Sequence, residues 1–177
     1  MMRLAIMGVL LGLLYGQAGS QGTPLSTCEL VSRRAELAGR IVTVRSEVKP
    51  GGHGPYLIAA PSCEYRLITR GVAWPNVVYL AYPDNKSRIE SYHADFQVDW
   101  RSVARAEEEE KRQGFNPASD RIFKTFIGLL VTYSDLENRV TPEVPGAPKL
   151  GFGPVGLDAP AQLLIKSVGD VVVVRGN

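Results

Sequence analysis

Histidine and recognisable catalytic motifs are scarce in this sequence. Among 177 residues only His53 and His93 are histidines, and neither has a cysteine, a second histidine or a group of carboxylates at metal-ligand spacing. Only Asp95 lies close to His93. No serine occupies a Gly-x-Ser-x-Gly elbow. These absences predict no metal site, no cofactor and no catalytic residue of a known motif.

Nucleotides and nucleic acids have little support as ligands. The stretch 151–156, Gly-Phe-Gly-Pro-Val-Gly, lacks the lysine of a phosphate loop and the glycine spacing of a dinucleotide turn, so we interpret it as a structural loop. The formal net charge is +2, and without Arg3 it falls to about +1. A surface with no strong overall sign does not attract a polyanion. We therefore do not expect nucleic acid as a partner.

Only one long apolar run is present, from Leu4 to Tyr15, and it is too short to span a bilayer. It follows Met-Met-Arg and precedes small or polar residues, which is the pattern of an export signal. Ala18 and Ser20 occupy the minus-three and minus-one positions for cleavage before Gln21. We predict a signal peptide over 1–20, a single domain over 21–177 with no transmembrane span, and a periplasmic or secreted location. An uncleaved anchor is the alternative.

The cysteine count is two, and in an exported chain an even count indicates a disulfide. Cys28 and Cys63 are 35 positions apart, so a bond between them would stabilise the fold by on the order of 3 kcal/mol. Two alternatives remain. Leu25-Ser26-Thr27-Cys28 is similar to the lipid-attachment box of bacterial lipoproteins, which would anchor Cys28 in a membrane, or the two cysteines are free buried thiols.

Strand patterns dominate the rest of the chain. From Arg40 to Val48 residues alternate, with Val42, Val44, Ser46 and Val48 on one face, as in a half-buried strand. Further strands are predicted over Tyr56–Ala60, Asn76–Tyr82, Ile122–Thr132 and Ala161–Val174. Gly128 is expected at a bulge or a close approach, and Gly169-Asp170 at a break in the last strand. A loop is expected over Glu137–Pro160, and the first two strands should form a hairpin.

Two helices are predicted. A short one runs from Ser26 or Thr27 to Leu37, and Gly39 ends it. A longer amphipathic one runs from about Asp95 to Gln113, with its apolar side chains spaced by helical turns at Phe96, Trp100, Val103 and Ala104. We expect this apolar face to plug one end of the fold, with Trp100 buried. Glu107 with Lys111 and Glu108 with Arg112 are expected as ion pairs on its solvated face.

The order of these elements predicts a mainly β fold with α. It is a five-stranded OB-like antiparallel barrel with an N-terminal helix and a second helix between the third and fourth strands. An open α+β sandwich is the alternative.

A resemblance agrees with this fold. The chain resembles exported, OB-like bacterial proteins of unassigned function in four stretches, Cys28-Glu29-Leu30, 37–45, Gly151-Phe152-Gly153 and 160–168. In such proteins a histidine commonly follows Gly-Phe-Gly, and Pro154 stands there in this chain. The resemblance implies a fold and an address outside the cytoplasm, and it implies no activity.

OB barrels bind ligands across their second and third strands, so we predict a binding face there. Its candidate residues are aromatic or basic and suit stacking on bases or sugars: Tyr56, Tyr65, Arg66, Arg70, Trp74, Tyr79 and Tyr82. Trp74 and Tyr79 could equally belong to the core. The leading hypothesis is an exported, non-enzymatic binding or interaction module for an unknown envelope or extracellular ligand or protein. The alternative is an envelope hydrolase or nuclease that uses Arg45, Glu47 and Asp170.

Overall fold

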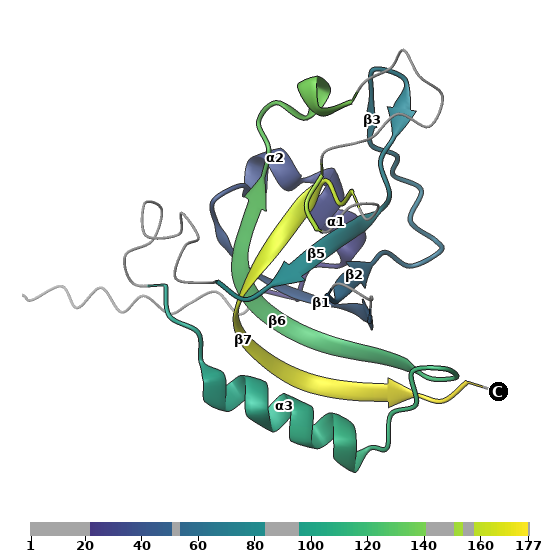
Figure 1. Ribbon diagram of the computed structural model, residues 1–177, viewed down its shortest axis with the longest axis vertical. Coiled ribbons are helices and arrows are strands. Elements are labelled where there is room, and N and C mark those ends of the chain that lie inside the picture. Colours follow the sequence, from purple (N-terminus) through teal and green to yellow (C-terminus); the bar gives the residue numbers. More distant parts are fainter. Residues whose placement is uncertain (1–21, 51–53, 84–95, 141–150, 154–157, 177) are drawn as a thin grey trace, which may run out of the picture.

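A computed structural model describes residues 22–50, 54–83, 96–140, 151–153 and 158–176 (Figure 1). Its elements are, in chain order, α1 (Thr27–Ser32), α2 (Arg34–Leu37), β1 (Ile41–Lys49), β2 (Tyr56–Ile58), β3 (Ile68–Thr69), β4 (Val72–Ala73), β5 (Val77–Ala81), α3 (Trp100–Arg112), β6 (Arg121–Thr132), the 3-10 helix η2 (Leu136–Arg139) and β7 (Ala161–Val174). The predicted signal segment, both histidines and Pro154 lie outside the described residues.

Five strands close into a barrel in the order β1-β2-β5-β7-β6. The predicted OB-like barrel, with an N-terminal helix and a helix between its third and fourth strands, is therefore confirmed, and the open sandwich is wrong. One detail differs, because β5 and β7 pair in parallel while the other neighbours are antiparallel. A closed ring with an odd number of strands cannot alternate direction all the way round, so one parallel pair is required.

Strand β1 alternates as its sequence predicts. Val42 and Val44 point into the barrel and are almost fully buried, and Ser46 is only 7% exposed. Eight of its residues, from Ile41 to Val48, pair with β6. The core continues with buried side chains of the other strands, among them Leu57, Val78, Leu80, Phe126, Leu130, Leu163 and Ile165. The barrel interior is thus filled with side chains, and any ligand must bind outside it.

The β6–β7 hairpin contains the two irregularities expected from glycine. The pairing shifts between Ile127 and Gly128, and a Cβ on Gly128 would lie 2.5 Å from the carbonyl oxygen of Leu164. Any larger residue would push the two strands apart at this point. A second shift in the pairing lies at Gly169 and Asp170, and Asp170 has a positive φ of 45°. The expectation for Gly128 is confirmed, whereas the expected break at Gly169-Asp170 is only a shift in pairing within a strand that continues to Val174.

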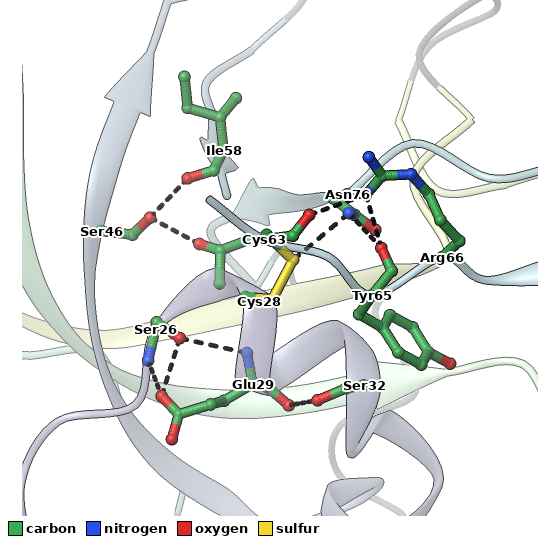
Figure 2. Close-up of a disulfide and its surroundings, with 11 residues drawn as sticks. Ser26, Cys28, Glu29, Ser32, Ser46, Ile58, Cys63, Tyr65, Arg66 and Asn76 are labelled. Carbon is green, nitrogen blue, oxygen red and sulfur yellow. Dashed lines mark hydrogen bonds between the residues drawn. A yellow bond between two sulfur atoms is a disulfide. The ribbon is translucent and has the colours of Figure 1, made fainter. Parts of the chain in front are cut away.

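The N-terminal helix is fastened to the barrel by the predicted disulfide (Figure 2). Cys28 and Cys63 are bonded, with a Cα–Cα distance of 5.7 Å. The Cys28 sulfur is already part of this bond, so it cannot carry a lipid, and neither cysteine is a free thiol. Both alternatives for the cysteines are therefore wrong. Next to it the Thr27 hydroxyl donates to Ser46 Oγ at 2.6 Å, and Ser46 Oγ donates to the carbonyl of Ile58 at 3.0 Å.

Helix α1 begins at a capping box. Glu29 N donates to the Ser26 hydroxyl at 3.2 Å, and Ser26 N donates to the Glu29 carboxylate at 2.7 Å. The Ser26 amide, and then the Ser26 hydroxyl at 2.8 Å, donate to the Glu29 carboxylate and lower the pKa of Glu29, because they favour its charged form. The predicted helix to Leu37 is not continuous. It is interrupted at Arg33, which has a ψ of 14° and stands between α1 and a second short helix, α2.

Helix α3 begins at Trp100, five residues later than predicted, because Asp99 caps it and accepts from the backbone of Arg101 and Ser102. Its buried residues are Ser102, Val103 and Ala106. Trp100 is 58% exposed. The prediction of a buried Trp100 is therefore wrong, and Ala104 of the predicted stripe is exposed as well. Phe96 precedes the helix and packs with Leu129 and Leu164 in a separate small cluster.

The buried side of α3 is set by β7 instead, beside which the helix lies in Figure 1. Asp99 N donates to the carbonyl of Lys166 at 2.7 Å, and Ser102 Oγ accepts from Val168 N at 3.0 Å. Gln113 Nε2 donates to the carbonyl of Val171, and its Oε1 accepts from Val173 N, both at 2.9 Å. Since β5 pairs with β7 only at 162–164, α3 covers the free edge of the lower part of β7.

The ion pairs on α3 also differ from the prediction. Glu109 pairs with Arg112 and Glu110 with Lys124 of β6, each at 2.6 Å. Within the described part of the chain, Glu107 and Glu108 form no ion pair, so the predicted Glu107–Lys111 and Glu108–Arg112 pairs are wrong. The reason is that Glu109 and Glu110 lie nearer to the barrel. No helix described here is long and apolar enough to cross a membrane.

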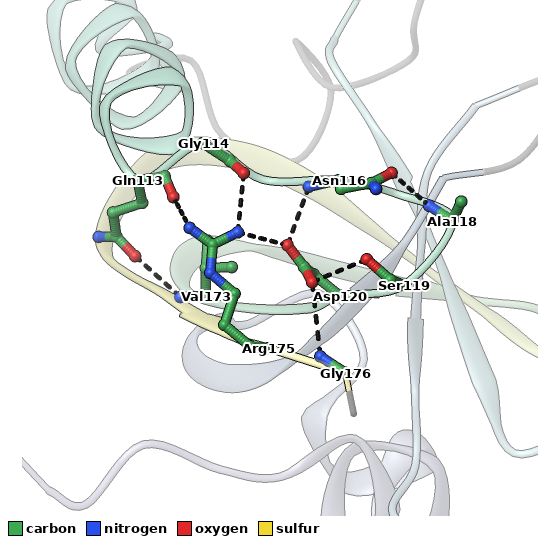
Figure 3. A network of polar contacts seen from close by, with 9 residues as sticks. All are labelled: Gln113, Gly114, Asn116, Ala118, Ser119, Asp120, Val173, Arg175 and Gly176. Carbon is green, nitrogen blue, oxygen red and sulfur yellow. Dashed lines mark hydrogen bonds and ion pairs between the residues drawn. The ribbon is translucent and has the colours of Figure 1, made fainter.

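A network of polar contacts fastens the C-terminal end (Figure 3). Arg175 Nη1 donates to the Asp120 carboxylate at 2.6 Å and to the carbonyl of Gly114 at 2.8 Å, and its Nη2 donates to the carbonyl of Gln113. Asp120 also accepts from Asn116 N at 3.0 Å and from the Ser119 hydroxyl at 2.9 Å. These donors, led by the Asn116 amide, lower the pKa of Asp120 from 3.8 to about 2.

Candidate functional site

The seven residues predicted to form a binding face lie in separate places. Tyr56 and Tyr79 are directly opposite each other on β2 and β5, on the outer side of the barrel, and both are half-buried. A Cβ on Gly54 would lie 2.7 Å from Tyr79 Oη, so a glycine there leaves room for the phenol. This pair occupies the part of the barrel where the prediction placed the binding face.

Three of the seven residues make contacts that hold the segment between β2 and β5. The Tyr65 hydroxyl accepts from Arg34 Nη1 at 3.1 Å, and Arg66 donates to the carbonyl of Cys63 at 2.8 Å. Trp74 is 3% exposed, and its Nε1 donates to Thr69 Oγ1 at 2.6 Å. Trp74 therefore belongs to the core, which was the alternative that the sequence left open.

The last two residues of the prediction are exposed. Arg70 and Gly71 have positive φ angles of 50° and 76° and form the two-residue turn of the β3–β4 hairpin, which the sequence analysis missed. Tyr82 follows β5 and contacts Trp100, with ring centroids 5.1 Å apart. The structure thus brings together Tyr56 with Tyr79, and Tyr82 with an aromatic residue outside the predicted set.

A cleft of about 850 Å³ lies between α2, the end of β6 and the segment that contains η2. We call it the α2–η2 cleft, and both helices lie at the top of Figure 1. Its lining includes Arg34, Ala35, Ala38, Thr69, Thr132, Tyr133, Ser134 and Asn138, together with the acidic Asp135 and Glu137 and the apolar Leu129, Leu130, Val131 and Leu136. The alanines are exposed and small, so they leave the cleft open, while the hydroxyl, amide and guanidinium groups offer hydrogen bonds. A volume of this size is typical of small-ligand sites.

Arg34 is the one fixed cation of this cleft among the described residues. Its Nη1 donates to the carbonyl of Val31 at 3.3 Å and to the Tyr65 hydroxyl. No other hydrogen bond of the guanidinium forms within the described ranges, so its Nε and Nη2 donors can serve a ligand. Tyr65 was predicted to contact a ligand. In the structure it orients Arg34 and does not itself line the cleft.

The opposite wall of the cleft is made rigid by stacking. The Tyr133 ring lies 4.1 Å from the Phe152 ring with an interplanar angle of 12°, and Arg139 Cζ lies 3.3 Å from the Tyr133 ring centroid. Arg139 also pairs with Asp135 at 3.1 Å. Phe152 is held by a β-bridge to Ala159. The Gly-Phe-Gly stretch is thus a structural loop in its described part, and its phenylalanine supports the cleft.

The three residues named for a hydrolase lie on the outer side of β1 and β7. Arg45 is 3.9 Å from the Asp170 carboxylate and donates to Thr125 Oγ1 at 3.1 Å, while Glu47 pairs with Arg121 at 2.5 Å. Each carboxylate thus already has an arginine partner. In the described ranges no three residues among His, Cys, Asp and Glu gather as a metal site.

Comparison with known proteins gives no identification: no protein-family model, no curated protein and no solved structure matches the chain. The function must therefore be argued from the barrel, the cleft and the surface groups themselves.

Proposed function

We propose that this protein is a non-enzymatic binding module, exported from the cytoplasm, that holds a polar ligand in the α2–η2 cleft. The observation that carries the proposal is the cleft itself, which combines about 850 Å³ of open volume with an arginine whose position is fixed by Tyr65 and Val31. A guanidinium that is already held in place loses little conformational entropy when a ligand binds, so the entropic cost of binding is smaller and the affinity is higher.

The lining indicates the kind of ligand. The exposed alanines of α2 leave room for a chain-like molecule, and the hydroxyls of Thr132 and Ser134 can donate and accept hydrogen bonds. Arg34 requires an oxygen acceptor. An oligosaccharide or a short peptide has this combination of many polar groups and an extended shape. We therefore propose an envelope or extracellular oligosaccharide or peptide as the ligand.

The disulfide supports the proposed address. Such bonds persist in oxidising compartments and are rare in the cytosol, so the Cys28–Cys63 bond fits a protein that folds outside the cytoplasm. The close pairing of Glu47 with Arg121 gives less support to the hydrolase or nuclease, because a general base or metal ligand needs an available carboxylate.

Calorimetric titration and thermal-shift measurements with a panel of oligosaccharides, peptides and oligonucleotides test this function. We expect saturable binding of an oligosaccharide or a peptide. Ala35→Trp, which fills the cleft, should abolish it, whereas Ala118→Trp, which adds the same side chain to an exposed alanine in the α3–β6 loop, should not. Arg34→Gln should weaken binding about 10- to 150-fold, and Arg33→Gln, a neighbour paired with Glu36, should leave it unchanged.

Binding that survives Ala35→Trp would place the ligand elsewhere and contradict the proposal. The same panel should be assayed for hydrolysis with and without a chelator. Turnover that disappears on chelation would favour the hydrolase or nuclease.

A further inference from the structure

Among the residues that the structure describes, the most exposed pair of aromatic side chains in contact is formed by Tyr82 and Trp100. Their side chains are 42% and 58% exposed, their ring centroids are 5.1 Å apart and their planes are inclined by 34°. The two residues come from different parts of the chain, since Tyr82 follows β5 and Trp100 begins α3. Together they form a continuous aromatic surface.

This surface is held on a rigid base. Next to Trp100, Asp99 caps α3 and its backbone N–H donates to the carbonyl of Lys166 at 2.7 Å. Ser102, one residue further, bonds the backbone of Val168. The first turn of α3 is thereby fixed to β7, and on the other side Tyr82 directly follows a barrel strand. A partner that binds here meets aromatic rings whose backbone is already in place.

Glu107 is the charged residue of the same helix stripe that lies nearest to the rings. With 3.6 residues per turn, Trp100, Ala104, Glu107 and Lys111 share one stripe of α3, and Glu107 is one turn closer to Trp100 than Lys111 is. Arg101 and Glu108 lie about a quarter turn to the side. Partial burial, and then the negative charge of Glu107, raises the pKa of Tyr82, which places that carboxylate within electrostatic reach of the ring. Glu107 forms no ion pair with any residue that the structure describes.

We propose that Tyr82, Trp100 and Glu107 form a docking surface for a basic side chain, an arginine or a lysine, of a partner polypeptide. A cation over an indole is attracted by the negative face of the ring, and tryptophan is the strongest of the aromatic residues in this respect. The same cation would approach the Glu107 carboxylate. The Glu107 carboxylate beside the rings therefore complements a cation.

The described part of the chain itself contains examples of this kind of contact. Arg139 lies 3.3 Å from the ring centroid of Tyr133, and Arg121 lies 5.1 Å from that of Phe123. In the part of the chain that the structure describes, no such cation covers Trp100. The surface is also separate from the α2–η2 cleft, since α3 and α2 lie at opposite ends of the molecule in Figure 1. The two proposals can therefore fail independently.

A pair of matched peptides tests the proposal. The first is a twelve-residue Gly/Ser peptide with three evenly spaced arginines, and the second has citrulline, which is neutral and nearly the same shape, in place of each arginine. We expect the arginine peptide to bind the full chain and to shift the indole N–H signal of Trp100 in NMR spectra. The citrulline peptide should bind about 2- to 30-fold more weakly.

Variants locate the contact. Trp100→Leu and Glu107→Gln should each weaken binding of the arginine peptide by a similar factor, while the unfolding midpoint stays close to that of the wild type because both side chains are exposed. Ile68→Ala and Glu64→Gln are the matched controls, since these residues are also exposed and belong to the β2–β5 segment. Ala35→Trp should leave peptide binding unchanged.

Three results would overturn the proposal: equal affinity for the arginine and citrulline peptides, an affinity that Trp100→Leu does not change, or no binding of either peptide at millimolar concentration.

Discussion

The two ends of the described chain are fastened to the barrel by different kinds of interaction. The N-terminal fastening, shown in Figure 2, consists of the Cys28–Cys63 disulfide and the buried hydroxyl chain from Thr27 through Ser46 to Ile58. The C-terminal clasp, shown in Figure 3, consists of Asp120 and Arg175 with the backbone groups around them. One is covalent and lies against the core, and the other is ionic and lies at the surface.

The N-terminal fastening and the C-terminal clasp also differ in burial. Beside the disulfide, Leu30 and Val31 of α1 are completely buried, whereas the clasp joins the Asp120 side chain, which is 4% exposed, to the Arg175 side chain, which is 59% exposed. Apolar burial and a disulfide do not depend on the charge of any side chain, so the N-terminal fastening should be insensitive to pH and salt. The clasp depends on an ionised carboxylate. It should therefore weaken with acid, and salt should screen it partly.

The largest effect is expected from removing the disulfide. Cys28→Ala with Cys63→Ala releases a loop of 35 residues, which should lower the free energy of unfolding by about 3 to 4 kcal/mol. Urea denaturation followed by circular dichroism measures this loss. Wild type treated with a reductant is the control and should show a similar loss. An unchanged midpoint would mean that packing of Leu30 and Val31 alone fastens this end.

A smaller effect is expected at the boundary of the clasp, where Gln113 bonds both the carbonyl of Val171 and the N–H of Val173. Gln113→Ala leaves two backbone groups of the β7 edge without these partners and should cost about 1 to 2 kcal/mol. Exchange of the Val173 amide hydrogen should also become faster.

Gln97→Ala removes the same side chain from an exposed position before α3, and its effect should stay within about 0.5 kcal/mol. If both variants behave alike, water replaces Gln113 at the strand edge without cost, and α3 does not protect β7 in the way described here.

The parts of the fold that follow from alternation could be predicted from the sequence. In β1 the valines at every second position must all face the same side, so their burial leaves a period of two. The disulfide followed from the cysteine count and the proposed export. The β3–β4 hairpin was missed because each strand has only two residues, although Arg70-Gly71 has the positive φ angles of such a turn.

The orientation of α3 could not be predicted, for a physical reason. Trp100 is apolar and correctly spaced, yet the helix is oriented by Ser102 and Gln113, which bond the free edge of β7. A hydrophobic pattern records only the apolar positions, so it does not show which polar residues face a strand edge. The α2–η2 cleft was equally hidden, since Arg34 and Ser134 are distant in sequence and meet only when β6 ends next to α2. The one sequence signal for this cleft was Phe152 in the Gly-Phe-Gly stretch, because its ring supports the wall of the cleft.

The smallest effect at neutral pH, and the sharpest contrast between the two ends, is expected from Asp120→Asn. The exposure of Arg175 and the resulting screening keep this effect below that of the disulfide. Asp120 has a pKa of about 2 in the folded protein against 3.8 for an ordinary aspartate, so its carboxylate stabilises the fold above pH 3.8. This contribution is lost as the pH falls from about 4 to about 2.

Thermal unfolding of wild type and Asp120→Asn from pH 7 to pH 2 should therefore give two midpoints that differ at neutral pH and converge in this range. Over the same range, the gap between wild type and the cysteine-free variant should stay constant, because both contain Asp120 and differ only in a bond that does not titrate. Midpoints of Asp120→Asn that follow the wild type at a constant distance down to pH 2 would show that the clasp does not depend on the charge of Asp120. In that case the difference between the two ends would lie in burial alone.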